Sequence, residues 1–284
     1  MADGLELLEL VDSGEGRFDA PMPEGSPEGR DVIFGGQILA QSIMAACANP
    51  ADPKIVKSIH TIFARAGTYA QPLHYQVTQV HDGRTFGSKT ISAWQGERML
   101  ASSIVLMTAG EDDLIAHHLA APDGLPTPEQ SGPPQEGSSF PGSIVRMAGP
   151  DDQVANGVPV STFWTRMLEP VPSVAASQAV LSWSTNGWLI GLAMEAHRDA
   201  VSLEQAHNTI STGVIAHTIH FHREFDAASW MGVAQEATFA GRGRVHGRGT
   251  VFDESGVLLA TFAQDSMVKA VDSTATSLGT RSRM

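Results

Sequence analysis

One stretch of the sequence carries groups that can hold an anion or polarise a carbonyl. Gly35, Gly36 and Gln37 lead into the almost wholly apolar segment 38–48, so we expect them at the start of a buried helix. The first N–H groups of a helix have no partner inside it and can bind an anion or a carbonyl oxygen. Glycines there also let a strand and a helix approach closely, and both interpretations stay open.

Three histidines form the pattern His217-x-x-His220-x-His222. On a strand, His220 and His222 share one face and His217 points to the other. No carboxylate has the local spacing that would complete a metal site, so we interpret them as strand histidines and expect no metal.

Basic residues gather at Arg242, Arg244, His246 and Arg248. Alternating arginines on a strand are typical of a solvated face, but they also bind phosphates. The whole chain is acidic, with 18 Lys and Arg against 31 Asp and Glu and a net charge of −13, which argues against a nucleic-acid binder. A phosphate-bearing ligand would therefore need this local cluster.

Other chemistries are excluded or unsupported. No Gly-x-Ser-x-Gly motif occurs, which argues against a serine hydrolase. Cys47 is the only cysteine; it lies in an alanine-rich segment, fits a reducing compartment, and is expected to be buried and inert. The acidic N-terminus does not resemble a signal peptide, and no apolar run is long enough to cross a bilayer. We expect a soluble, cytoplasmic protein without membrane insertion.

Prolines divide the chain. Eight of the 16 lie between Pro122 and Pro159, which predicts a Pro/Gly-rich linker over 111–159. This leaves an N-terminal domain, 1–110, a C-terminal domain, 160–271, and a polar tail, 272–284, that we expect to be flexible.

Both domains have the same order of elements. An apolar helix opens at Gly35 in the first and at Asn186-Gly187 in the second, and each helix is expected to be buried on all sides. Strand-like runs follow each helix, and one precedes the second helix at Val160–Arg166. The runs are Ile55–Ala64, Leu73–Val80, Thr85–Trp94 and Met99–Thr108, then Gly213–His222, Met231–Phe239, Val245–Phe252 and Val257–Val268. The pattern predicts an α+β fold with a curved antiparallel sheet wrapped around a central helix, the hotdog architecture, occurring twice.

Several short motifs occur in the order of one known family. Val32-Ile-Phe-Gly-Gly-Gln-Ile-Leu-Ala-Gln41 resembles the start of the TesB-like acyl-CoA thioesterase II family, and Ser58-Ile-His-Thr-Ile-Phe-Ala-Arg-Ala-Gly67 resembles its next strand. Phe221-His-Arg-Glu-Phe225 and Ser255-Gly-Val-Leu-Leu-Ala-Thr-Phe-Ala-Gln264 resemble motifs of its second half. The resemblance implies a double hotdog, an acyl-CoA substrate hydrolysed without a cofactor, and a homo-oligomer. It also implies three catalytic side chains: an Asp where the second helix begins, a Ser or Thr on the next strand, and a Gln on the last.

This chain departs from that pattern. The glutamine is Gln264, but the Asp position is Asn186 and the hydroxyl position is Val214. An amide can hold a water but cannot accept its proton, and Asn is also a favoured helix N-cap. Thr212 would share a strand face with Val214, and a bulge could bring it to the site. His60 could act near neutral pH as a base, or be an ordinary strand histidine.

We therefore predict an acyl-CoA thioesterase or, alternatively, a catalytically degenerate acyl-CoA-binding protein on the same fold. The predicted catalytic residues are Gln264, Asn186 and Thr212. The predicted substrate-binding residues are Gly35, Gly36, Gln37, His60, Arg242 and Arg244.

Overall fold

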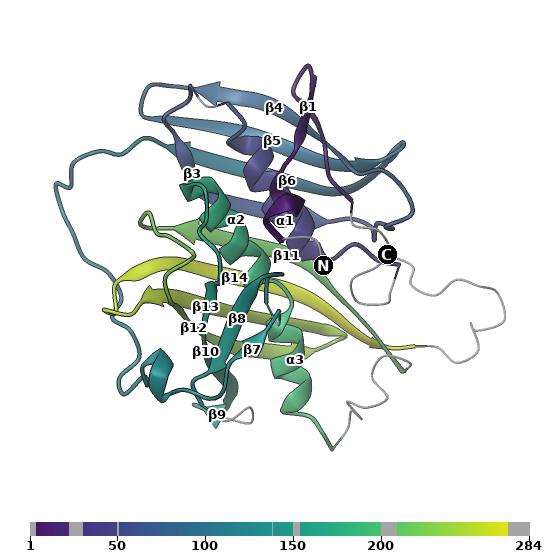
Figure 1. The fold of residues 1–284 in the computed structure, drawn as a ribbon. Helices are drawn as coiled ribbons and strands as arrows, with labels where there is room; N and C mark the ends of the chain where they lie inside the picture. The colour runs from purple at the N-terminus through teal and green to yellow at the C-terminus, as the bar shows by residue number, and fades with distance from the viewer. Residues whose placement is uncertain are drawn as a thin grey trace.

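The computed structural model describes residues 4–22, 31–49, 51–137, 139–149, 154–199 and 209–271. The predicted flexible tail, 272–284, lies outside these residues. The described strands form one large antiparallel sheet, with the helices on its inner face (Figure 1). This arrangement agrees with the predicted α+β class.

The sheet runs in the order β1-β2-β4-β5-β6-β3-β11-β14-β13-β12-β10-β8-β7, and β9 pairs with β10. The N-terminal strands are β1 (Val11–Gly14), β2 (Arg17–Asp19), β3 (Ile55–Phe63), β4 (His74–Asp82), β5 (Phe86–Gln95) and β6 (Arg98–Thr108). The C-terminal strands are β7 (Gln135–Glu136), β8 (Ser143–Met147), β9 (Val154–Ala155), β10 (Val158–Met167), β11 (Ile210–Phe221), β12 (Met231–Gly241), β13 (Arg244–Asp253) and β14 (Leu258–Ala270).

The centre of the sheet is the antiparallel pair β3 and β11, in which His60 lies opposite Thr218. Moving outward, β6, β5 and β4 follow β3, while β14, β13 and β12 follow β11. All of the strand-like runs in the sequence are strands in the structure. They form because side chains alternate along them; β5, for example, buries every second residue and leaves the others partly exposed.

Two helices pack against each other beneath the middle of the sheet. They are α1 (Gly35–Ala46), which the sequence predicts, and α2 (Val174–Ser184), which our reading of the sequence missed. Both are buried on nearly all sides. Ser173 caps α2, accepting a hydrogen bond from the Ala176 N–H at 3.1 Å, so a start signal was present in the sequence.

The third helix, α3 (Trp188–Glu195), packs on the C-terminal strands β10, β12, β13 and β14. The expectation that it is buried on all sides is wrong: only Leu189, Leu192 and Ala193 are fully buried, and Gly191 is exposed. A helix that covers the end of a sheet has one face in contact and one face free. The close packing needs Gly247 on β13, where a Cβ would lie 2.7 Å from the Leu189 side chain.

Part of the segment 111–159 forms regular secondary structure. It contains a short 3-10 helix, η2 (Pro128–Gln130), and the strands β7, β8 and β9; a second 3-10 helix, η1 (Gly4–Leu8), lies near the N-terminus. The segment is tied to the sheet where the Trp164 indole N–H donates to the Pro126 carbonyl at 2.9 Å. Among the described helices, none has the length and apolar character needed to span a membrane.

Candidate active site

Gln264 lies on β14, next to Gly187 at the start of α3. Its side chain is 1% exposed, and its Oε1 accepts a hydrogen bond from the Gly187 N–H at 3.1 Å. Its Nε2 donates to the Ser266 hydroxyl at 2.9 Å. A backbone N–H can only donate, so the amide must face Gly187 with its oxygen. One N–H and one lone pair of the amide then remain for another group.

Asn186 directly precedes Gly187, and its buried side chain has no hydrogen-bond partner among the described residues. It is 3% exposed, and both Oδ1 and Nδ2 are unpaired. The prediction that it is the helix N-cap is wrong, because Gly187, with φ of 102°, occupies that position and α3 has no side-chain cap. An unpaired buried polar group costs about 1–3 kcal/mol, and its free donor or acceptor is available to a bound molecule.

The start of α1 meets Asn186, although the two are far apart in sequence. A Cβ on Gly35 would lie 3.2 Å from Asn186 Oδ1, and a Cβ on Gly36 would lie 2.3 Å from the Phe34 ring and 3.0 Å from the Trp183 carbonyl. The glycines therefore serve the close approach that the sequence suggested. The same approach brings Gly35 and Gly36, whose N–H groups have no partner within the helix, to the Asn186 side chain.

Gln37 completes this first turn. It is fully buried, its Oε1 accepts a hydrogen bond from the Tyr69 hydroxyl at 3.3 Å, and its Nε2 is unpaired. It belongs with Gly35 and Gly36 at the start of α1, as predicted.

His217 also lies next to Gln264, although it is not among the predicted site residues. It lies opposite Gln264 in the β11–β14 register, is fully buried, and its Nε2 is 3.1 Å from the Thr185 hydroxyl. Thr185 Oγ1 also lies 3.2 Å from the Ser182 carbonyl, and His217 Nδ1 has no hydrogen-bond partner among the described residues. Complete burial lowers the pKa of His217 to about 3, so the ring is neutral at neutral pH.

A bulge in β11 decides which residues share the face of Gln264. The register shifts between Val214 and Ala216, so that Val214 and His217 both face inward, opposite Ser266 and Gln264 respectively. The bulge follows Thr212 and does not bring it to the site. Thr212 is exposed and lies opposite Val268, about 13 Å along β14 from Gln264 at about 3.3 Å per residue.

The remaining predicted residues lie away from Gln264. His60 is exposed on the outer face of the sheet and shares a hydrogen bond of 2.6 Å with Thr218. Arg242 is in the turn between β12 and β13, and Arg244 is exposed on β13. Asp265 is exposed and points away from the site, as its position next to Gln264 predicts.

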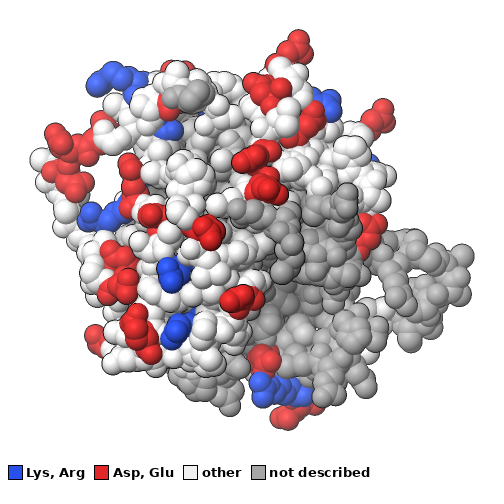
Figure 2. All heavy atoms as spheres, in the orientation of Figure 1, with Lys and Arg blue, Asp and Glu red and all other residues white. Residues whose placement is uncertain are grey.

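The distribution of charge on the surface reflects the acidic composition of the chain. On the face shown in Figure 2, acidic side chains are scattered widely and basic ones stand between them as separate groups. Arg248 forms an ion pair with Glu236 at 2.6 Å, so one member of the predicted basic cluster is already neutralised. Cys47 offers no nucleophile, because burial raises the pKa of its thiol to about 11.

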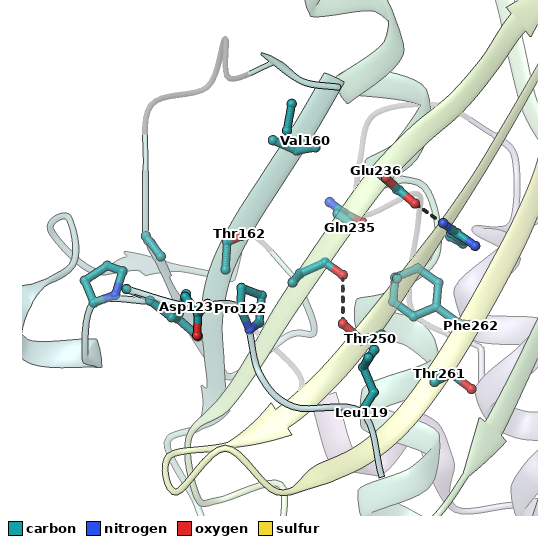
Figure 3. A pocket seen from close by; sticks show the side chains of 18 residues that line it. Leu119, Pro122, Asp123, Val160, Thr162, Gln235, Glu236, Thr250, Thr261 and Phe262 are labelled. Carbon is teal, nitrogen blue, oxygen red and sulfur yellow. Dashed lines mark hydrogen bonds and ion pairs between the residues drawn. The ribbon is translucent and has the colours of Figure 1, made fainter. Parts of the chain in front are cut away.

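One cavity lies on the outer face of the sheet. It has a volume of about 870 Å³ and is enclosed between residues 119–126 and the outer side of the strands that carry Thr162, Thr250 and Thr261 (Figure 3). Gln264 points to the opposite face, because it alternates with Thr261, Ala263 and Asp265 along β14. Neither Gln264 nor Asn186 lines the cavity.

Comparison with known proteins identifies the family. A model of the acyl-CoA thioesterase N-terminal domain matches residues 22–109, and a model of the corresponding C-terminal domain matches residues 120–268. The chain belongs to the acyl-CoA thioesterase family. The resemblance to TesB-like acyl-CoA thioesterase II is thereby confirmed.

Relatives in this family are distant but similar over most of their length. Human acyl-coenzyme A thioesterase 8 is 25% identical over 265 residues, which cover 84% of this chain and 80% of that protein. Acyl-CoA thioesterase 2 of Haemophilus influenzae is 24% identical over 255 residues, covering 84% and 87%.

Solved structures show the same fold. The tesB protein of Mycobacterium avium subspecies paratuberculosis superposes with a TM-score of 0.79 at 22% identity, covering 94% of this chain and 98% of that one. Acyl-CoA thioesterase II TesB2 from Mycobacterium marinum gives 0.76 at 21% identity, covering 95% and 99%. A large antiparallel sheet of the hotdog type with few helices is therefore common to this chain and these proteins.

Proposed function

We propose that this protein hydrolyses acyl-CoA thioesters at the start of α3. The observation that carries the proposal is the unpaired, buried amide of Asn186 beside Gln264, in a chain of the acyl-CoA thioesterase family. Two amides and the first turn of α1 converge there, and together they can hold a water and a carbonyl oxygen.

The reaction follows from these groups. A water held by Asn186 and Gln264 attacks the thioester carbonyl carbon, and the carbonyl oxygen gains negative charge. The free N–H of Gln264 and the N–H groups of Gly35 and Gly36 are the donors available to that oxygen. The carbon–sulfur bond then breaks, and the CoA thiolate leaves with a proton from the water.

Asn186 limits the rate of this reaction. It cannot take the proton of the attacking water, and general-base assistance contributes about 10²–10⁴-fold. We therefore expect measurable but slow hydrolysis compared with an Asp at this position.

A thiol-release assay tests the proposal. Purified protein is incubated with straight-chain acyl-CoAs from acetyl to palmitoyl, and free CoA is measured with a thiol reagent. Turnover above background with at least one chain length is expected. Background rates at every chain length would contradict the proposal.

The alternative is an acyl-CoA-binding protein that does not hydrolyse its ligand. It is favoured by the two departures from the family pattern, Asn186 and Val214. It predicts acyl-CoA binding by calorimetry without CoA release, and hydrolysis on introducing N186D together with V214T. Wild-type turnover would reject this alternative.

We also propose that the fold is a double hotdog, with repeats 1–110 and 160–271 joined by 111–159. The mirrored strand order around the β3–β11 pair supports it, because β3-β6-β5-β4 on one side corresponds to β11-β14-β13-β12 on the other, and the two buried helices α1 and α2 pack together beneath the middle. A homo-oligomer is supported by Ile62, Ile104 and Leu106, which are exposed together on the outer face of β3 and β6. Light scattering after gel filtration measures the mass in solution and so tests the homo-oligomer. Only a monomeric mass would contradict it. A cytoplasmic location stays a prediction.

A further inference from the structure

The hydroxyl that the family resemblance places on β11 is missing here, because position 214 is valine. Its cross-strand partner in the register of β11 and β14 is Ser266. Directly opposite residues have Cβ atoms about 4.5–5.5 Å apart and point to the same face. A hydroxyl on residue 266 therefore lies within a few ångströms of where a hydroxyl on residue 214 would be.

Ser266 already contacts the site. It is fully buried, and its Oγ accepts the hydrogen bond from Gln264 Nε2 at 2.9 Å. Its own hydroxyl hydrogen has no acceptor among the described residues, and Val214 across the ladder offers none. Gln264 is thus held at both ends, by Gly187 on its oxygen and by Ser266 on its nitrogen.

We propose that Ser266 is a positioning residue that replaces, from β14, the hydroxyl lost from β11. It fixes the Gln264 amide so that one N–H and one lone pair stay available to the substrate and water, and its free O–H can donate to the water held there. This inference rests on the proposed thioesterase function. It explains how a chain with valine at position 214 keeps a hydroxyl in the site.

The test removes the hydroxyl and then returns it on the other strand. S266A should lower kcat for acyl-CoA hydrolysis about tenfold, because a buried N–H of Gln264 loses its acceptor, while KM changes less than about twofold. V214T added to S266A should restore most of the lost kcat, since Thr and Val have nearly the same shape. S266T should keep near wild-type kcat.

Ser103 provides a matched control. It is a buried serine on β6, in the N-terminal half, whose Oγ lies 2.7 Å from the Thr61 hydroxyl. S103A also loses a buried hydrogen bond, so it should lower stability by a similar amount and leave kcat unchanged. Equal losses of kcat in S103A and S266A, or failure of V214T to restore S266A, would overturn the inference.

The wild-type rate separates this inference from the proposed function. If the wild type hydrolyses acyl-CoA and S266A is equally fast, only the role of Ser266 is wrong. If the wild type is inactive at every chain length, the proposed function is wrong, and the comparison is repeated in the N186D background. There, activity that falls with S266A and returns with V214T supports the role of Ser266. Unchanged activity in S266A, or no activity in N186D itself, contradicts it.

Discussion

Buried polar side chains on the inner face of the sheet are hydrogen-bonded differently in the N-terminal and C-terminal halves. Beneath the N-terminal strands, Thr61 on β3 and Ser103 on β6 lie opposite each other and share a hydrogen bond of 2.7 Å. Beneath the C-terminal strands, the corresponding cross-strand pair is His217 and Gln264, and each keeps an unused hydrogen-bonding group.

The difference shows which half of the fold keeps unpaired buried polar groups, at a cost in stability. A closed Thr–Ser pair stabilises a sheet and binds nothing, whereas unpaired buried groups lower stability unless a ligand or water completes them. In α1, which is described in full, the one unpaired side-chain atom is Gln37 Nε2, in the turn that meets Asn186. The N-terminal half thus contributes the start of its helix, and the C-terminal half contributes the side chains.

The largest expected effect comes from giving the C-terminal half a base. N186D should raise kcat by about 100-fold or more, because a carboxylate can accept the proton of the attacking water. The rate should also rise with pH as the new carboxyl ionises. Kinetics of CoA release between pH 5 and 9 measure both. The exposed N49D carries the same added charge at the end of α1 and should leave kcat unchanged. A slower N186D would contradict the role of Asn186 in holding water.

The contact between the two halves can be broken at its glycines. G36A should lower the unfolding free energy by about 1–3 kcal/mol, because its Cβ would lie 3.0 Å from the Trp183 carbonyl of the other half and 2.3 Å from the Phe34 ring. The displaced helix start should also lower kcat. G35A should lower the unfolding free energy less, since its Cβ would come closer than ordinary contact only to Asn186 Oδ1, at 3.2 Å. Urea unfolding measures both, with G110A, which meets nothing within 4 Å, as the control. Equal stability of G36A and G110A would contradict this account.

Buried His217 should make the C-terminal half sensitive to acid. Its pKa is about 3 in the folded protein against 6.5 as its ordinary value, so below pH 6.5 the unfolded chain takes up a proton that the folded one does not. The unfolding free energy should therefore fall with falling pH, by up to about 1.4 kcal/mol per unit.

Unfolding in urea between pH 4 and 7 checks this. H217N should show a shallower slope than the wild type, and H60N, on the exposed outer face, should not. The lowered pKa values of Asp52 and Asp253 add to the slope in the same direction but are common to all three proteins. Identical slopes in H217N and wild type would show that His217 is not held neutral.

The smallest effect is expected at Thr212. Its exposed hydroxyl lies on the ladder opposite Val268, away from Gln264. T212A should therefore change kcat/KM by less than about twofold. A loss of about tenfold or more in the same thiol-release assay would show that Thr212 takes part in the site. The register of β11 against β14 would then have to differ from the one described.

Much of the fold could be predicted because alternation and apolar helices are local signals. The strands from β3 to β6 and from β11 to β14 follow from period-two patterns, and α1 follows its two glycines. Helix α2 was missed because serines and a glutamine interrupt its apolar residues without an amphipathic period, although Ser173 marked its start.

The site could be predicted only in part. Gln264 and Asn186 were predicted from the family resemblance, and in the structure the N–H of Gly187, the residue after Asn186, donates to Gln264. Ser266 and His217 could not be placed, because the bulge after Val214 sets which side chains share a face, and a one-residue shift reverses that choice. The contact of Gly35 with Asn186 depends on how the two halves pack, which no local pattern encodes.

The most direct measurement is the rate of CoA release by Q264A beside Q95A. Gln95 is a matched control, a buried glutamine of the N-terminal half whose Nε2 donates to the Thr68 and Gln71 carbonyls. If the chemistry takes place at the start of α3, Q264A should lose about 100-fold or more in kcat while Q95A keeps wild-type turnover. A folded Q264A that releases CoA as fast as the wild type would contradict the account.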